Sequence, residues 1–360
     1  MKKKIRVGIM GAGGIARAAY LPNLQKLKDV EVVAISEKEK VRGKEVAKEF
    51  NIPYLFTDFK EMLKLNLDGV GICLPNFLHK EATIASLKAG SNVLCEKPPA
   101  LNAQDAKEMS AWAKRKKKIL MIGLTWRFRS DSWALKKFID AGELGRIYYL
   151  RCGYLRRRGI PGFGGWFTTK AKSGGGVLVD CGVHLLDLAL YFMGNPKAIT
   201  VSGSTYDKFG GRMSRGEKIA GMEKISWPPD YKVKEKTFDV EDLACALIKL
   251  EKGATLFLEV SWVSNIEKNF GYLSLFGDKG GADLRTDREL RIYRELRGNL
   301  VDVNPRLKPQ DEYFEEMKHF IECIRKNKRP SPSGEEGWEV MKILDAIYLS
   351  AKTGKEVKLP

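Results

Sequence analysis

The sequence predicts an α/β domain with a doubly wound parallel sheet, followed by an α+β domain with a large, open and predominantly antiparallel sheet. Up to about residue 123, apolar strand-like runs alternate with helix-like segments, which is typical of a parallel sheet covered on both faces. Beyond this point the alternation gives way to long strand-like runs, two of which meet at Lys252-Gly253 as in a hairpin.

The elements of the first domain, residues 1–123, follow from these runs. We expect strands at 5–10, 30–36, 69–74, 92–95 and 119–123, and helices at 14–27, 38–50, 79–89 and 102–116.

The second domain covers residues 124–360. Its predicted helices are 131–141, 178–193, 311–326 and 335–353, and its predicted strands are 146–155, 238–250, 254–263 and 270–276. The last helix can pack back on the first domain. Residues 207–236, rich in Gly, Lys and Pro, are expected to form a long loop.

Composition favours a folded protein of the cytoplasm. The chain has 360 residues, 44% hydrophobic and 30% charged, which suggests two domains. No long apolar segment follows the N-terminal lysines, and no apolar run is long enough to cross a bilayer, so we expect no membrane partner. The cysteines are scattered without a Cys-x-x-Cys pair, which favours reduced thiols over a zinc site: Cys73, Cys95, Cys152, Cys181, Cys245 and Cys323.

The formal net charge of +18 raises the question of nucleic-acid binding. The basic residues are spread over several runs, including 114–118 and 232–236, and such runs are usually solvated faces. No helix-turn-helix or basic stripe with stacking aromatics is recognisable, so we expect no nucleic-acid partner. A positive field still attracts anionic cofactors and substrates.

A glycine-rich turn, Gly11-Ala-Gly13-Gly-Ile-Ala16, follows the first predicted strand at the place where a Rossmann fold holds a dinucleotide. Gly11 permits the tight turn, and Gly13 lets backbone N–H groups approach a pyrophosphate. Glu37, after the second strand, stands where an acidic residue meets the ribose hydroxyls. The predicted cofactor residues of this region are Gly11, Gly13, Gly14, Ile15 and Glu37. The alternative is a tight turn without a ligand.

Two further motifs end parallel strands, where ligand crevices form. In Leu74-Pro-Asn-Phe-Leu-His79, the side chains of Pro75, Asn76 and His79 can frame the nicotinamide ribose, or the segment is only a turn that begins a helix. In Cys95-Glu96-Lys97-Pro98, Lys97 can stabilise an alkoxide, while Glu96 holds local geometry or meets the cofactor ribose. The alternative for this second motif is an exposed ion pair in a loop.

The third motif after the glycine-rich turn, Gly174-Gly-Gly-Val-Leu-Val-Asp180-Cys-Gly-Val-His184-Leu-Leu-Asp187, combines a glycine run with spaced polar residues. Asp180 and His184 are four residues apart and share one face of a helix, as suits a base and the carboxylate that orients it. The alternative is a capped helix with a histidine satisfied by its neighbours.

Taken together and in this order, these motifs resemble those of the glucose-fructose oxidoreductase and inositol dehydrogenase family, Gfo/Idh/MocA. The resemblance covers nearly the whole chain. It implies a two-domain NAD(P)-dependent oxidoreductase that acts on the CH–OH group of a sugar, cyclitol or sugar derivative. It also implies a homodimer or homotetramer built through the C-terminal sheet. By the same resemblance, Lys97 is the catalytic lysine, and Asp180 and His184 are its polar partners.

In the implied mechanism, His184 accepts the proton of a ring hydroxyl while Lys97 stabilises the oxygen, and hydride passes to the nicotinamide. This chemistry calls for no metal. Glu37 favours NAD over NADP because it repels a 2′-phosphate, although Lys38 and Lys40 can neutralise that phosphate.

The same resemblance, together with their positions, makes several aromatic and basic residues candidates for the substrate pocket. Aromatic faces pack against sugar C–H groups, and arginine binds hydroxyls or carboxylates through paired donors. The candidates are Arg127 and its neighbours Trp126 and Phe128, Tyr154, Arg156 in the run to Arg158, Trp166 and Lys170, together with Asp180 and His184. The arginine run can equally protect a sheet edge. The alternative function is a non-catalytic dinucleotide-binding sensor.

Overall fold

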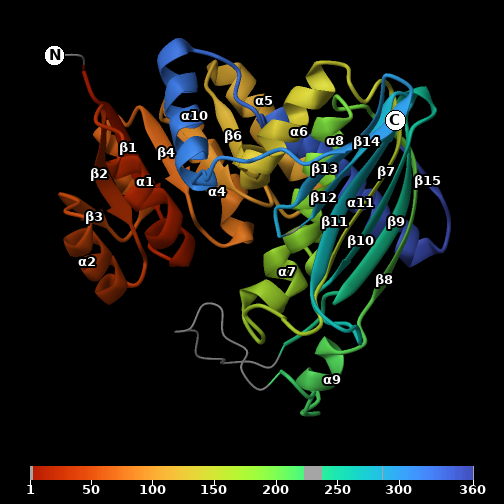
Figure 1. The fold of residues 1–360 in the computed structure, drawn as a ribbon. Coiled ribbons are helices and arrows are strands. Elements are labelled where there is room, and N and C mark those ends of the chain that lie inside the picture. The colour runs from red at the N-terminus through yellow and green to blue at the C-terminus, as the bar shows by residue number, and fades with distance from the viewer. Residues whose placement is uncertain (1–2, 223–236, 286, 360) are drawn as a thin grey trace. The chain divides into compact units, whose positions relative to one another are not determined.

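The computed structural model describes residues 3–222, 237–285 and 287–359 (Figure 1). The chain forms two compact units. The first unit comprises Met1–Phe128 and Gln310–Trp338, and the second comprises Arg129–Pro309 and Glu339–Pro360. The sequence predicts a domain boundary after residue 123, and the position of this boundary stays a prediction.

The first unit contains a six-stranded sheet in the order β3-β2-β1-β4-β5-β6, with every neighbouring pair parallel. The strands are β1 (Ile5–Met10), β2 (Val30–Ser36), β3 (Tyr54–Phe56), β4 (Gly69–Ile72), β5 (Asn92–Glu96) and β6 (Leu120–Gly123). This strand order is that of a doubly wound dinucleotide-binding sheet, so the predicted fold class is confirmed for this unit.

Helices connect these strands, and side-chain caps fix the starts of several of them. Glu39 accepts hydrogen bonds from Val41 N and Arg42 N at the start of α2. Asn102 and Asp311 cap α5 and α10 in the same way. The helical elements of the unit are η1 (Ala16–Tyr20), α1 (Leu21–Gln25), α2 (Lys40–Glu49), α3 (Phe59–Met62), η2 (Leu63–Leu65), η3 (Asn76–Leu78), α4 (His79–Lys88), α5 (Ala103–Lys116), η4 (Thr125–Phe128) and α10 (Glu312–Lys326).

The second unit is built on a nine-stranded sheet in the order β14-β13-β12-β11-β7-β10-β9-β8-β15. Only the β7–β10 pair is parallel among these neighbours, which confirms the predominantly antiparallel prediction. The strands are β7 (Ile147–Leu155), β8 (Ala198–Tyr206), β9 (Leu243–Leu250), β10 (Thr255–Ser261), β11 (Phe270–Gly277), β12 (Gly280–Arg285), β13 (Leu290–Leu296), β14 (Asn299–Val303) and β15 (Val357–Lys358).

The helices of the second unit include α8, which is buried almost throughout. It contacts β7 and β10, where Leu150, Cys152 and Leu258 are fully buried. The helical elements are α6 (Ser130–Asp140), η5 (Trp166–Thr168), α7 (Lys170–Ser173), η6 (Leu178–Gly182), α8 (Val183–Phe192), α9 (Gly210–Ser214) and η7 (Glu251–Gly253), and α11 (Gly334–Thr353) continues into this unit from the first.

The stretch Lys170–Phe192 is the one helical segment among the described residues that has the length and hydropathy of a membrane span. Most of it is buried inside the protein, as in the core helix of a globular fold.

The face of the second sheet that is turned away from α8, here called the open face, carries exposed large side chains. The strand register places Arg151 opposite Ser274, and Tyr149 opposite Phe276, on this face. Leu247 and Phe270 are each 42% exposed there. Tyr272 donates a hydrogen bond to Glu259 (2.7 Å), and Arg151 lies over the Tyr272 ring.

Several element predictions were wrong in detail. The strand expected from residue 238 begins at Leu243, because Asp242 in the preceding loop accepts hydrogen bonds from the backbone N–H groups of residues 208–210. The strands β3, β8 and β12 to β15 were not anticipated. The expected loop at 207–236 contains the short helix α9, and residues 223–236 of it lie outside the described residues.

Candidate functional site

The glycine-rich turn of the first unit combines a tightly constrained glycine with open space. Gly11 adopts a φ of +93°, and a Cβ there would lie 2.5 Å from the backbone oxygen of Cys73. A Cβ on Gly13 would meet nothing within 4 Å, so space remains beside its backbone. The chain then enters a π-helical turn, η1, a distortion that is frequent at functional sites.

Glu37 is buried between this turn and the start of α2. Its Oε2 accepts a hydrogen bond from Ala12 N (2.8 Å), and its Oε1 accepts bonds from Glu39 N (2.9 Å) and the Arg42 guanidinium (2.8 Å). Burial alone would raise the pKa of Glu37, but these hydrogen bonds, that of Arg42 foremost, lower it below its ordinary value. The side chain is therefore a fixed carboxylate beside the glycine turn.

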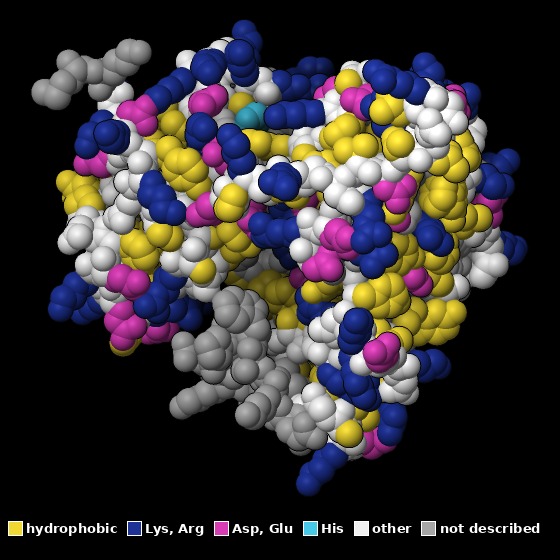
Figure 2. Space-filling model, in the orientation of Figure 1, with side chains coloured by type: hydrophobic (Ala, Val, Ile, Leu, Met, Phe, Trp, Pro, Cys, Tyr) yellow, Lys and Arg dark blue, Asp and Glu magenta, His cyan; other side chains and the backbone are white. Residues whose placement is uncertain are grey.

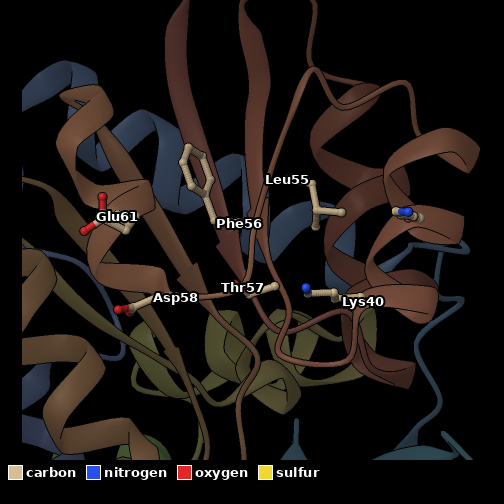
Figure 3. A pocket seen from close by; sticks show the side chains of 7 residues that line it. Lys40, Leu55, Phe56, Thr57, Asp58 and Glu61 are labelled. Carbon is tan, nitrogen blue, oxygen red and sulfur yellow. The ribbon is translucent and has the colours of Figure 1, made fainter.

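A hollow of about 440 Å³ lies close to Glu37, between α2, β3 and α3. Figure 3 shows Lys40 and Leu55 on one side of it and Asp58 and Glu61 on the other. Lys44 also lines it. Because its lining mixes both signs of charge, the hollow does not by itself select an anion.

The segment after β4 carries two buried polar residues. Asn76 is almost entirely buried, and His79 is fully buried as the first residue of α4. The two ring nitrogens of His79 lie 2.8 Å from the carbonyl oxygens of Pro98 and Leu74. His79 thus ties this segment to the Glu-Lys-Pro loop, which favours a structural role over contact with a ribose.

Glu96 and Lys97 end β5 with contrasting surroundings. Lys97 is half-buried, whereas Glu96 is 9% exposed and its Oε1 is fully buried. Burial raises the pKa of Glu96, and the neighbouring Lys97 offsets part of that rise. Of the two roles considered for Glu96, this position favours holding local geometry over meeting the cofactor ribose.

In the second unit, the third motif begins with a close backbone contact. A Cβ on Gly176 would lie 1.9 Å from the carbonyl oxygen of Glu241, so only glycine fits there. The buried Glu241 carboxylate accepts hydrogen bonds from Gly176 N (3.0 Å) and Leu178 N (2.9 Å), and from the Tyr348 hydroxyl (2.9 Å). These contacts fix the start of the helical segment that carries Asp180 and His184.

Asp180 lies in the π-helical turn η6, and His184 lies in the first turn of α8. Asp180 Oδ2 accepts a hydrogen bond from the indole N–H of Trp262 (3.0 Å) and lies 3.4 Å from Cys181 Sγ. Sequence reasoning missed Trp262, because a tryptophan just after a strand gives no signal of the aspartate it meets.

Arg156 and Tyr154 belong to the surroundings of Asp180. The Arg156 guanidinium lies 5.1 Å from the centre of the Tyr154 ring. Burial alone would lower the pKa of Arg156, but the neighbouring Cys181 and Asp180 raise it above its ordinary value. An arginine, a tyrosine, a tryptophan and an aspartate thus gather at one end of the second sheet.

The rest of the arginine run serves the fold. Arg157 donates to the Glu267 carbonyl (2.8 Å). Arg158 donates to the carbonyls of Ala220 and Ser264, and therefore ties the loop after β8 to the loop after β10. These contacts support neither substrate binding nor protection of a sheet edge.

Three other pocket candidates also have defined intramolecular contacts. Arg127 is 3% exposed and pairs with Glu336 (2.7 Å) in the first unit. Trp166 packs against Phe167, with ring centres 4.7 Å apart. Lys170 lies over the ring of Tyr348. Their assignment to a substrate pocket stays a prediction.

The structure therefore gathers the candidates into two groups. The first unit holds the glycine turn, Glu37 and the loops that carry Asn76, Glu96 and Lys97. The second unit holds Asp180, His184, Arg156, Tyr154, Trp166 and Lys170. Among the described residues, no group of three or more His, Cys, Asp or Glu side chains could hold a metal ion.

Comparison with protein families shows to which family the chain belongs. Residues 5–124 match the oxidoreductase family with an NAD-binding Rossmann fold, GFO_IDH_MocA, and residues 133–283 match the GFO/IDH/MocA C-terminal domain. The chain belongs to the Gfo/Idh/MocA family. This membership confirms the resemblance drawn from the four motifs, and it makes the chain an NAD(P)-dependent oxidoreductase.

Individual members of the Gfo/Idh/MocA family match over the full length. The chain is 33% identical to the D-glucoside 3-dehydrogenase of Escherichia coli (strain K12) over 358 residues, 99% of this chain and 97% of the relative. It is 26% identical to the myo-inositol 2-dehydrogenase of Thermotoga maritima over 366 residues, 99% of this chain and 98% of the relative.

Solved structures agree on the fold. A levoglucosan dehydrogenase in complex with NADH superposes with a TM-score of 0.85 at 23% identity, covering 99% of this chain and 100% of that one. At this identity the likeness shows that the two chains share the Gfo/Idh/MocA fold.

Proposed function

We propose that this oxidoreductase removes hydride from a secondary ring hydroxyl of a glucoside or a related sugar or cyclitol. The observation that carries the proposal is full-length similarity to a D-glucoside 3-dehydrogenase, in a chain that has Lys97, Asp180 and His184 in its motifs. Other full-length relatives are named as dehydrogenases of inositols, levoglucosan and xylose. These names support turnover over the alternative of a non-catalytic sensor.

The first unit fits the dinucleotide. The positive φ of Gly11, the space beside Gly13 and the carboxylate of Glu37 are what its pyrophosphate and ribose need. Glu37 supports NAD as the preferred cofactor, whereas Arg42, directly hydrogen-bonded to Glu37, offers a partner for the phosphate of NADP. Bound NAD supplies the hydride acceptor.

The chain's own residues handle the proton and the charge at the reacting oxygen. His184 takes the hydroxyl proton on a ring nitrogen, and the Lys97 ammonium stabilises the negative charge that develops on the oxygen. Asp180 accepts a hydrogen bond from Trp262 and lies near Arg156. It precedes His184 by four residues and supplies a fixed negative charge to this segment. In the reverse direction, protonated His184 returns the proton to the oxygen.

The test is a substrate panel followed by reduced-nicotinamide absorbance, with NAD and NADP in parallel. We expect turnover with methyl glucoside or a close analogue, and weaker turnover with myo-inositol and levoglucosan. Direct titrations should show tighter binding of NADH than of NADPH. Tight NADH binding without turnover on any sugar or cyclitol would favour the sensor, and tighter NADPH binding would overturn the assignment of Glu37.

We also propose that the open face of the second sheet joins two copies of the chain. Its exposed Leu247 and Phe270, with Arg151 stacked over aromatic rings, suit a self-complementary surface with an apolar centre. A hollow of about 360 Å³ on the same face, lined by Arg151, Phe276 and Tyr293, offers room for a partner side chain.

The buried thiols support the cytoplasm as the compartment.

A further inference from the structure

Glu241, in the loop before β9, holds the start of the helical segment that carries Asp180. The residue is 7% exposed, and it accepts hydrogen bonds from three consecutive backbone N–H groups. Its carboxylate accepts from Gly176 (3.0 Å) and Leu178 (2.9 Å), and its main-chain carbonyl accepts from Val177 (3.2 Å). The first N–H groups of a helix have no partner within the helix, so these bonds determine where the segment begins.

The Glu241 carboxylate is itself held from α11. The Tyr348 hydroxyl donates to its Oε1 (2.9 Å), the same oxygen that accepts from the N–H of Leu178. A Cβ on Gly175 would lie 1.9 Å from the Tyr348 hydroxyl oxygen, so this hydroxyl packs directly against the glycine run. The glycines at 175 and 176 are therefore required by contacts within the protein, the first by Tyr348 and the second by the Glu241 carbonyl.

The loop that contains Glu241 lies behind two separate contacts of Asp180. The backbone N–H of Asp180 donates to the carbonyl of Gly176 (3.1 Å), the residue that Glu241 anchors. The side chain of Asp180 accepts from the indole N–H of Trp262. The backbone N–H of Trp262 in turn donates to the carbonyl of Asp242 (2.8 Å), which follows Glu241 in the chain. Both the backbone and the carboxylate of Asp180 are thus tied to residues 241–242.

We propose that Glu241, held in place by Tyr348, is a positioning residue of the reaction, which acts by fixing the orientation of Asp180. The inference rests on the proposed function, because it requires that Asp180 orients His184. Without the Tyr348 hydroxyl, the Glu241 carboxylate keeps only its backbone donors and holds the start of the helical segment less firmly. The loss then falls on the chemical step and not on the binding of sugar or cofactor.

Tyr348→Phe removes the hydroxyl and keeps the ring over which Lys170 lies. Because one hydrogen bond to a buried carboxylate is lost, kcat should fall about three- to tenfold at a temperature well below melting, with KM for sugar and NAD changed by less than about twofold. Tyr54→Phe makes the same change at a position of β3 that is 51% exposed, and it should keep the wild-type kcat. A Tyr348→Phe protein with a lower melting temperature and a wild-type kcat would overturn the proposal.

The dependence on Asp180 is tested in the Asp180→Asn background. Tyr348→Phe should cause no further loss of kcat there, because the residue that it positions is already impaired. Glu241→Gln replaces one acceptor oxygen with an amide donor and should show the same non-additivity. Equal fold-losses of kcat in the wild-type and Asp180→Asn backgrounds would overturn the positioning role. If Glu241→Gln does not fold, Tyr348→Phe carries the comparison alone.

Amide hydrogen exchange of residues 174–182 measures the anchor without turnover. In Tyr348→Phe, the N–H groups of Gly176 and Leu178 should exchange about threefold faster or more, whereas Tyr54→Phe should match the wild type. Unchanged exchange in Tyr348→Phe would overturn the anchor and the proposal with it. If the wild type turned over no sugar or cyclitol, the proposed function would fail and the positioning role with it, but the exchange rates would still establish or refute the anchor.

Discussion

The contact between Trp262 and Asp180 shows how one residue outside the motifs completes the polar group of the second unit. The indole N–H can only donate, and its acceptor is Asp180 Oδ2 at 3.0 Å. A carboxylate held by a buried, rigid donor keeps one orientation. This anchoring suits a residue expected to orient His184.

Lys97→Ala tests the charge at the reacting oxygen. We expect turnover to fall about a hundredfold or more, while NADH affinity changes little, because the lysine acts mainly on charge that develops during the reaction. Steady-state kinetics and NADH titration on one preparation measure both quantities. A variant with near wild-type turnover would remove Lys97 from the chemical step.

His184→Asn separates proton transfer from packing. Asparagine keeps a polar side chain but cannot take up a proton near neutral pH, so turnover should fall about a hundredfold to ten-thousandfold and lose its pH dependence near neutrality. Asp180→Asn should give a milder loss, because the imidazole remains. A lower melting temperature with an unchanged pH profile would assign His184 to the fold alone.

Trp262→Phe tests the anchoring of Asp180. Phenylalanine keeps most of the buried ring but loses the N–H donor, so the variant should be less stable by about 1 to 3 kcal/mol and turn over more slowly. Trp133→Phe, at a position 36% exposed, is the matched control. Denaturant melts and kcat measure the two effects. Equal behaviour of both variants would argue against a role for the Trp262 hydrogen bond.

At the scale of elements, both glycine motifs lead into a π-helical turn before an α-helix. The glycines differ in what they permit: Gly11 and Gly176 avoid clashes with backbone oxygens, whereas Gly13 only leaves space. Sequence spacing located both motifs correctly. It could not foresee the π-turns, because their extra residue leaves the apolar pattern of the helix almost unchanged.

The two first glycines give a contrasting pair of variants. Gly11→Ala should destabilise the protein by several kcal/mol, about the cost of a positive φ plus a clash with the Cys73 carbonyl. Gly13→Ala should leave the melting temperature nearly unchanged and weaken NADH binding. Thermal melts with and without NADH compare them. A strongly destabilised Gly13→Ala would show that this glycine serves the fold.

The elements that sequence reasoning missed share physical causes. The strand β3 has only three residues, too few for a periodic signal. The strands β12 to β14 carry many charged residues because they lie towards one edge of the sheet, half exposed. Long buried strands such as β1 and β2 were predicted with their observed bounds, since continuous apolar runs leave few alternatives.

The site residues divide along similar lines. Motif spacing predicted Glu37 and the Asp180–His184 segment as site residues, because the chain order itself creates those neighbourhoods. It could not find Arg42 on Glu37 or Trp262 on Asp180, since each partner comes from a part of the chain without a motif of its own.

At the scale of the whole molecule, the charge of +18 is distributed over the surface. Figure 2 shows Lys and Arg side chains scattered across the visible face, with Asp and Glu between them. Such a distribution raises the local concentration of anionic cofactor without forming a single binding stripe.

Assembly through the open face can be broken at one position. Arg151→Glu replaces a cation stacked over aromatic rings with an anion, near the Glu259 carboxylate, and should convert oligomers to monomers. Light scattering after size exclusion measures the mass. Lys114→Glu, at an exposed position of α5, makes the same charge change elsewhere. Unchanged mass in Arg151→Glu would contradict this interface.

One cysteine on the open face can be used to follow assembly. Five of the six cysteines are buried, whereas Cys245 is only partly buried and lies on β9 opposite Glu259 on the open face. Burial, and then Glu259, raise the pKa of Cys245, so labelling needs alkaline buffer and a small reagent. A chain that associates through the open face will shield this one sulfur. The rate of alkylation at Cys245 should then fall as protein concentration rises, and native cysteine chemistry alone can follow assembly.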